Sequence, residues 1–234
     1  MRWMLIVVAT LTFATSGLCE QDMWTDRAEA DLDGDGAAEQ ISLERLDRVV
    51  GAFTLHVGEA DITDRLSDDV SGLRVVDIWG HDDYREVAVH TNGPSDDPDT
   101  WLFWYNGSEL HRVGRIAGYL SIGPFAWVYA RQWMGFWDRS CAWLLDNETH
   151  RLDEQAQDFY AVDLTATVRT AHPIYRTPDL ATVAGQMQPG TSVTVVACRW
   201  ADEYEDLRYL VVLPGGETGW LGDITGALNV AVAD

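Results

Sequence analysis

Short strand-like runs, each followed by residues that favour turns, are the feature that most restricts how this chain can fold. Eight such runs lie at residues 39–43, 53–57, 73–77, 86–90, 101–105, 110–115, 125–130 and 142–145. Turn signals such as Asn106-Gly107 separate them, and no later stretch keeps a long helical period. Residues 151–157 are polar and fit either a short helix or a loop. With 47% hydrophobic residues the chain can form a core, so we expect an all-β protein.

The charge of the chain excludes several partner classes. There are 38 acidic and 16 basic residues, all of the latter Arg, giving a net charge of −22. Such a chain repels nucleic acid and anionic membranes, and it suits cation binding or a solvated acidic surface. Residues 20–160 carry 29 acids and 11 Arg, whereas 161–234 carry 9 and 4. This change in composition predicts two modules that meet at about residue 160.

Residues 1–19 have the pattern of a signal peptide. Arg2 precedes an apolar run over 3–13, and small or polar residues lead to a predicted cut before Glu20. A lipid anchor on Cys19 is the alternative, although Leu18 is larger than the residue usual before such a cysteine. No later segment is apolar enough to span a membrane. We therefore expect an exported protein of the periplasm, cell envelope or exterior. Its remaining cysteines, Cys141 and Cys198, are predicted as buried thiols rather than a disulfide.

An acidic loop is the most specific motif in the sequence. Its candidate calcium ligands are Asp31, Asp33, Asp35, the carbonyl of Ala37, and Glu39. Alternate carboxylates can point at one centre, and Gly34 and Gly36 allow the backbone to turn around it. The loop is not an EF-hand, because Ser42 occupies the twelfth position and strand-like residues flank it. Without a metal, the same residues would form a turn held by Asp side chains.

A weaker copy of this loop follows about 46 residues later. Asp77 to Glu86 also leads into a strand, a period typical of propeller repeats. The first loop resembles the calcium loops of FG-GAP and VCBS-type repeats, which implies a blade-like β-meander braced by calcium. In the second copy Trp79 and His81 replace carboxylates, so a structural turn is expected there. The acidic loop at 93–99 is expected to be solvated, with a second cation as the alternative.

The C-terminal part has the rhythm of a small barrel. Its marks are Ile174-Tyr175, Pro189-Gly190-Thr191, Tyr209-Leu210-Val211 and Gly219-Trp220. In this order they resemble bacterial SH3-like domains, from which residues 202–206 depart as an acidic insert. The resemblance implies a barrel that binds peptides or cell-wall material through an aromatic groove. The candidate ligand-binding residues are Tyr175, Trp200, Tyr209 and Trp220. The alternative of a core position is favoured for Tyr209 and Trp220, and Trp200, next to the polar insert, is expected to be the more exposed ring.

No motif of the sequence predicts catalysis. The six His have no metalloprotease spacing, and neither a nucleophile elbow nor a phosphate-binding Gly loop is present. We expect a monomeric, non-catalytic binding protein whose partner is a peptide, an exported protein or a cell-wall polymer. One alternative is an accessory or inhibitory protein that docks through the Trp-rich segment 127–143. Another is a carbohydrate-active enzyme, because carboxylate pairs are abundant.

Overall fold

The computed structural model describes residues 24–46, 49–93, 97–200, 207–222, 224 and 226–230. Every regular element among them is a β-strand, and every strand pairing is antiparallel, which confirms the all-β prediction. No helix among these residues is long and apolar enough to cross a membrane. The predicted signal peptide, Cys19 and the insert at 202–206 lie outside the described residues.

The N-terminal part folds as three successive four-stranded meanders. The first sheet contains β1 (Arg27–Ala30), β2 (Glu39–Arg45), β3 (Ala52–Val57) and β4 (Ala60–Arg65). The second contains β5 (Gly72–Val76), β6 (Glu86–Thr91), β7 (Asp99–Tyr105) and β8 (Leu110–Ala117). The third contains β9 (Tyr119–Ile122), β10 (Trp127–Trp133), β11 (Asp138–Asp146) and β12 (Arg151–Glu154). Their first strands begin at 27, 72 and 119, so the repeats are 72 − 27 = 45 and 119 − 72 = 47 residues long.

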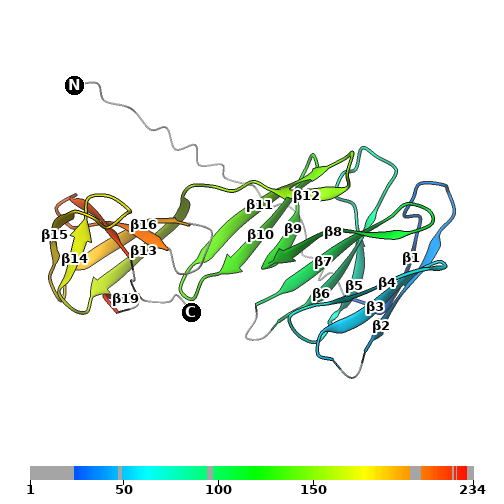
Figure 1. The fold of residues 1–234 in the computed structure, drawn as a ribbon, viewed down its shortest axis with the longest axis horizontal. Coiled ribbons are helices and arrows are strands. Elements are labelled where there is room, and N and C mark those ends of the chain that lie inside the picture. Colours follow the sequence, from blue (N-terminus) through cyan, green and yellow to red (C-terminus); the bar gives the residue numbers. More distant parts are fainter. Residues whose placement is uncertain are drawn as a thin grey trace, which may run out of the picture.

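The three sheets stack in chain order, with one apolar layer between each neighbouring pair (Figure 1). Phe53 of the first sheet meets Phe103 of the second edge to face, with ring centroids 6.0 Å apart. Leu102 and Ile116 of the second sheet pack with Val128 of the third. Both faces of the middle sheet are therefore covered, and β6 is buried along its whole length. The outer sheets each keep one face open.

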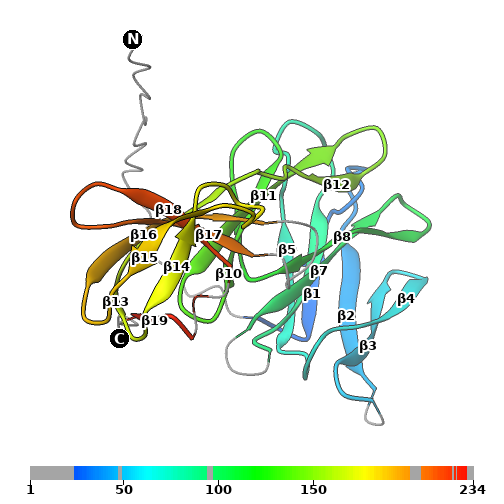
Figure 2. The ribbon, with the colours of Figure 1, turned by 60° about the vertical axis from the view of Figure 1, so that its left-hand side comes forward.

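The described residues between 160 and 230 form one seven-stranded sheet that curls around its own core (Figure 2). Its strands are β13 (Tyr160–Val168), β14 (His172–Tyr175), β15 (Val183–Met187), β16 (Ser192–Arg199), β17 (Arg208–Val212), β18 (Thr218–Leu221) and β19 (Leu228–Val230). The order is β15-β14-β18-β17-β16-β13-β19. Alternate residues of β16, including Val193 and Val195, point into the core, as its period of two predicts.

The β10–β11 hairpin joins the sheet stack to the barrel. At its tip, Trp137 is only 4% exposed and belongs to the barrel core, where Phe136 packs beside Tyr209. At the start of β11 the Arg139 guanidinium lies 4.1 Å from the ring centroid of Trp200 and donates to Tyr160 Oη at 3.1 Å. The barrel core is thus completed by residues from the third sheet.

Several local expectations changed in three dimensions. Residues 151–154 form β12 rather than a helix or a loop, because their backbone pairs with β11. The polar strands β1 and β4, and the short strands β9 and β19, gave no clear signal of their own and are ordered by pairing with neighbours. Cys141 and Cys198 are buried free thiols, and burial raises the pKa of the Cys198 thiol to about 11.

Candidate functional site

The acidic loop connects β1 to β2 and bends sharply between them. Gly34 and Gly36 have φ angles of 76° and 89°, the left-handed backbone that glycine adopts without steric cost. Asp31 holds this bend, because its two carboxylate oxygens accept from the Gly34 N–H at 2.8 Å and the Gly36 N–H at 3.0 Å. The glycines therefore act as the sequence predicts, and the first carboxylate organises the turn.

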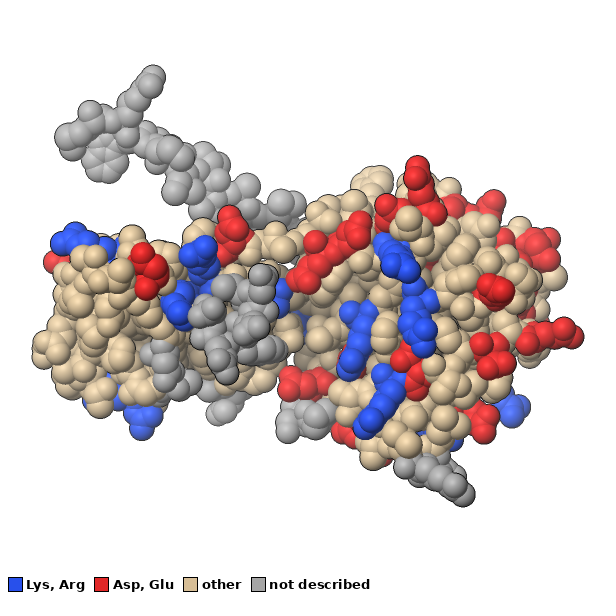
Figure 3. Space-filling model, viewed as in Figure 1, with Lys and Arg blue, Asp and Glu red and all other residues tan. Residues whose placement is uncertain are grey.

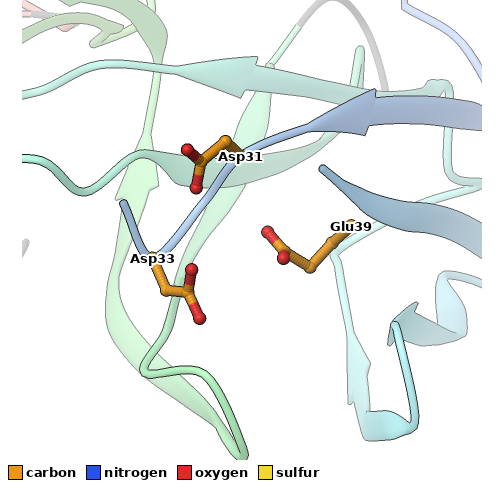
Figure 4. Close-up of side chains that lie close together, drawn as sticks. All are labelled: Asp31, Asp33 and Glu39. Carbon is orange, nitrogen blue, oxygen red and sulfur yellow. The ribbon is translucent and has the colours of Figure 1, made fainter. Parts of the chain in front are cut away.

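Three of the five predicted ligands converge. Carboxylate oxygens of Asp31, Asp33 and Glu39 all lie within 4.8 Å of one another. Figure 4 shows Glu39 reaching from the start of β2 toward the two Asp residues at the end of β1 and in the loop. Glu39 Oε2 also accepts from the Leu32 N–H at 2.7 Å, which fixes the side chain across the loop. These three half-buried carboxylates have the hard oxygen chemistry that calcium prefers.

The other two predicted ligands lie on the outer side of the loop. Asp35 is exposed and stands outside the group of converging carboxylates. Its Oδ1 accepts from the Ala37 N–H at 2.7 Å, so these two residues close a small turn together. The spacing thus brings Asp31, Asp33 and Glu39 together, while Asp35 faces solvent.

Neighbouring turns of the second sheet hold the loop in place. Leu32 is fully buried between the sheets, and its carbonyl accepts from the Arg85 N–H at 3.0 Å. A methyl group on Gly34 would lie 2.4 Å from Cβ of Asp83. The loop therefore spans the first two sheets, so a cation bound there would fasten one sheet to the next.

The electrostatic field of the loop reaches a buried tyrosine. Burial raises the pKa of the Tyr105 hydroxyl, and the nearby charges of Glu39, Asp33 and Asp35 raise it further. Negative potential of this kind costs free energy when several carboxylates lie close together, and a bound cation would offset it.

The second loop repeats one contact of the first. Glu86 Oε2 accepts from the Ile78 N–H at 3.1 Å, which parallels the bond between Glu39 and Leu32. Unlike Glu39, Glu86 is only 1% exposed. Burial, helped by the charges of Asp82 and Asp77, raises its pKa to about 7. Glu86 lies at the end of the weaker copy of the loop in the sequence. Its equivalence to Glu39 became clear only because each of the two residues ends a loop between two strands and accepts a backbone N–H of that loop.

The acidic loop at 93–99 ends in an ion pair. Asp99 is 3% exposed, and its carboxylate accepts from the Arg115 guanidinium and from the Ser67 N–H. Its charge therefore joins β7 to β8, so Asp99 is not solvated as the sequence led us to expect for this loop. Residues 94–96 of the same loop lie outside the described part of the chain.

The four aromatic residues predicted on the barrel fall into two places. Tyr175 and Trp220 are half-buried and directly opposite on β14 and β18, and the exposed Phe159 ring lies 6.0 Å from Trp220. Tyr209 is 4% exposed and belongs to the barrel core, which the sequence offers as the alternative to a ligand-binding role. Trp200, expected to be the more exposed ring, is half-buried against the barrel core under Arg139. A half-buried aromatic pair therefore forms at Tyr175 and Trp220, with the exposed Phe159 as an added member.

The Trp-rich segment 127–143 is divided between the interior and the surface. Trp137 is buried in the barrel core, and Trp143 packs in the layer between the second and third sheets. Trp127 is half-buried and Trp133 is 40% exposed, both on the opposite side of β10 from buried Val128. The alternation of a strand explains the division.

Comparison with known proteins gave no match to a family model, to a curated protein or to a solved structure.

Proposed function

We propose that this chain is an exported, non-catalytic binding protein with two working parts. Calcium braces the β1–β2 loop of the sheet stack, and the barrel binds a peptide or cell-wall polymer through Tyr175 and Trp220. The observation that carries the proposal is the convergence of Asp31, Asp33 and Glu39 on one point.

The position of the loop explains why calcium would serve structure rather than catalysis. The loop is held by Arg85 and Asp83 of the second sheet, so an ion there links two layers of the stack. Asp31 and Glu39 already accept backbone hydrogen bonds, which orients their remaining lone pairs before any ion binds. Water or a loop carbonyl would complete the 6–8 oxygens that calcium takes.

Calorimetric titration of residues 20–234 with CaCl₂ tests the metal proposal. We expect exothermic or endothermic heat with a defined stoichiometry, and a melting temperature that rises with calcium by mass action. Asp33→Asn should remove both effects, because this side chain accepts only one loop N–H and otherwise faces the cluster. Asp61→Asn, an exposed acid on β4, is the matched control and should bind calcium normally. Absence of both heat and thermal shift in the unmodified protein would refute the calcium brace.

The barrel proposal depends on the aromatic group formed by Tyr175, Trp220 and Phe159. Directly opposite residues on antiparallel strands have Cβ atoms about 4.5–5.5 Å apart, so the side chains of Tyr175 and Trp220 share one face. Phe159 extends this face by one ring. Flat aromatic surfaces with polar tips suit extended ligands that are already ordered before binding.

Co-sedimentation with purified peptidoglycan tests the barrel. We expect retention of the unmodified protein and loss of retention in Trp220→Ala, whereas Thr165→Ala, at an exposed position on β13 away from Tyr175 and Trp220, should be retained. Point variants are preferable to deletion of 161–234, because deletion would expose Phe136 and Trp137. Equal retention of the Trp220 variant would exclude Trp220 from the binding surface.

A further inference from the structure

The outward face of the third sheet carries a row of aromatic side chains. Because strand side chains alternate, Val128 and Ala130 face the second sheet while Trp127, Tyr129 and Trp133 face away from it. Tyr129 and Trp133 are each 40% exposed. Tyr119 on β9 and Leu144 on β11, with 53% and 37% exposure, widen the row. We call the outward side of β9–β12 the aromatic face.

The other end of the stack is a natural comparison. The outward face of the first sheet carries Gln40, Ser42, Glu44, Thr54, His56, Asp61 and Thr63. Thr54 and Thr63 are hydrogen-bonded across it at 3.0 Å. A polar outer face is what a terminal layer needs for solubility. The aromatic face departs from this rule, although both terminal sheets cover the same middle sheet, so packing of the stack does not account for it.

Two rings of the aromatic face present flat surfaces. A Cβ on Gly123 would lie 2.4 Å from Cε2 of Tyr129, so the ring lies against a backbone that has no side chain there. The planes of Trp127 and Tyr129 are within 9° of parallel, with centroids 5.9 Å apart. Glycine at 123 thus makes room for a ring that lies down on the sheet, next to a second ring of the same orientation.

The hairpin before β10 holds a third ring in a strained conformation. Phe125 and Ala126 are consecutive and have φ angles of 58° and 65°. Non-glycine residues with such angles are uncommon, and the strain favours Asn-Gly at these positions of a two-residue hairpin. Phe125 nevertheless stands at the tip with 71% of its surface exposed, and its ring stacks on His81 of the β5–β6 loop with centroids 6.2 Å apart. Strain that presents an apolar ring to solvent is typical of binding surfaces.

Polar groups alternate with the rings, and the charge is nearly balanced. Opposite Tyr129 stands Ser121, and opposite Arg131 stands Ser140. The outward positions of the four strands carry these charged residues: Arg131, Asp138, Asp146, Arg151 and Asp153. Two Arg against three Asp give −1 over these outward positions. Figure 3 shows, for one side of the molecule, acids scattered over the sheet stack with a row of basic side chains among them.

We propose that the aromatic face binds a neutral, β-linked glycan chain. Pyranose rings with equatorial hydroxyls have apolar C–H faces that stack on aromatic rings, and their edges bond to groups such as Arg131, Ser121 and Ser140. Outward residues on one strand repeat every 6–7 Å, about two residues of rise, so the row suits a linear polymer rather than a single sugar. An uncharged polymer fits better than an acidic one, because the chain's excess of 38 acidic over 16 basic residues would repel an acidic partner.

The test is calorimetric titration of residues 20–234 with hexamers of β-1,4-linked N-acetylglucosamine and of β-1,4-linked glucose. We expect at least one hexamer to bind. Trp127→Ala and Tyr129→Ala should each weaken binding at least about tenfold, equivalent to about 1.4 kcal/mol. Tyr129→Phe, which keeps the ring, should stay within about threefold of the unmodified protein. Val183→Ala serves as the exposed apolar control on the barrel.

Several outcomes would overturn the proposal. The first is that neither hexamer binds. The second is that binding survives Trp127→Ala and Tyr129→Ala but is lost in Trp220→Ala, because the ligand would then belong to the barrel. The third comes from sedimentation equilibrium: a dimer that Tyr129→Phe preserves and Tyr129→Ala dissociates would show that a second copy covers the face. Since the calcium and peptidoglycan experiments use other residues, failure here is distinguishable from failure of the proposed function.

Discussion

Gly34 and Gly36 have the same backbone conformation but very different surroundings. Any side chain at either position suffers the strain of positive φ, about 1–2 kcal/mol. At Gly34 a Cβ would also collide with Asp83, whereas nothing lies within 4 Å of a Cβ at Gly36. The first glycine therefore allows two sheets to approach, and the second only allows a turn.

Alanine at these two positions should separate the two effects. Gly36→Ala should lower the free energy of unfolding by about 1–2 kcal/mol. Gly34→Ala should cost clearly more, and should also weaken calcium binding, since Asp83 must move away from the loop. Urea unfolding with and without calcium measures both. Equal costs for the two variants would show that the contact with the second sheet contributes nothing.

The buried Glu86 should make stability depend on pH. Its pKa in the folded chain is about 7, above the ordinary 4.5, so the folded state holds the proton more tightly than the unfolded state. The contribution of Glu86 to the free energy of unfolding is then fully present below about pH 4.5, and it is lost as the pH rises through about 7. Burial of the charged form is the main cause.

Glu86→Gln should flatten this dependence. The amide keeps an acceptor for the Ile78 N–H and cannot ionise, so the difference in unfolding free energy between variant and parent should change by roughly 3 kcal/mol between pH 4 and 8. Urea unfolding across this range, in the presence of a chelator, provides the measurement. Burial also raises the pKa of Asp82, so some slope should remain. A difference that is constant with pH would contradict the prediction.

At the level of elements, the β10–β11 hairpin contributes both to the surface of the third sheet and to the core of the barrel. Along β10 it offers rings to solvent, and at its tip it supplies Trp137 to the barrel core. Just beyond the tip, Arg139 bonds to Glu154 at 2.8 Å while its guanidinium stacks on Trp200. One hairpin thus belongs to the third sheet by its backbone and to the barrel by its tip.

Trp137→Ala should therefore destabilise the barrel. Loss of a buried Trp costs about 3–5 kcal/mol, and here the loss falls on the barrel although the residue belongs to the third sheet. Trp133→Ala, four residues earlier and 40% exposed, should cost about 0.5 kcal/mol or less. Amide hydrogen exchange in β13–β19 locates the effect. Unchanged exchange there in Trp137→Ala would mean that the tip is not part of the barrel core.

For the whole molecule, charge and shape are unequally distributed. The acids concentrate in the sheet stack, which lies at one end of an elongated chain with the barrel at the other (Figure 1). Some charge is neutralised locally, as when Arg115 pairs with Asp99 and Arg112 with Asp64. The remaining excess of negative charge repels itself and opposes the compact state.

Screening should therefore stabilise the protein. With a chelator present, raising NaCl from 10 to 200 mM should increase the melting temperature by roughly 2–4 °C, which corresponds to about 1 kcal/mol. Thermal unfolding followed by circular dichroism gives the value. A decrease with salt would mean instead that ion pairs such as Arg112–Asp64 outweigh the overall repulsion.

The sequence by itself determined most of the strands, the repeat of about 46 residues and the acidic loop that holds the carboxylate cluster. These depend on local patterns: alternation fixes a strand, and Asp31 to Glu39 are close along the chain. Only the tertiary structure decided that Asp35 faces solvent, that Tyr209 and Trp137 are core residues and that Glu86 is buried. The reason is physical, because a pattern with period two separates the faces of a strand but does not say which face another layer covers.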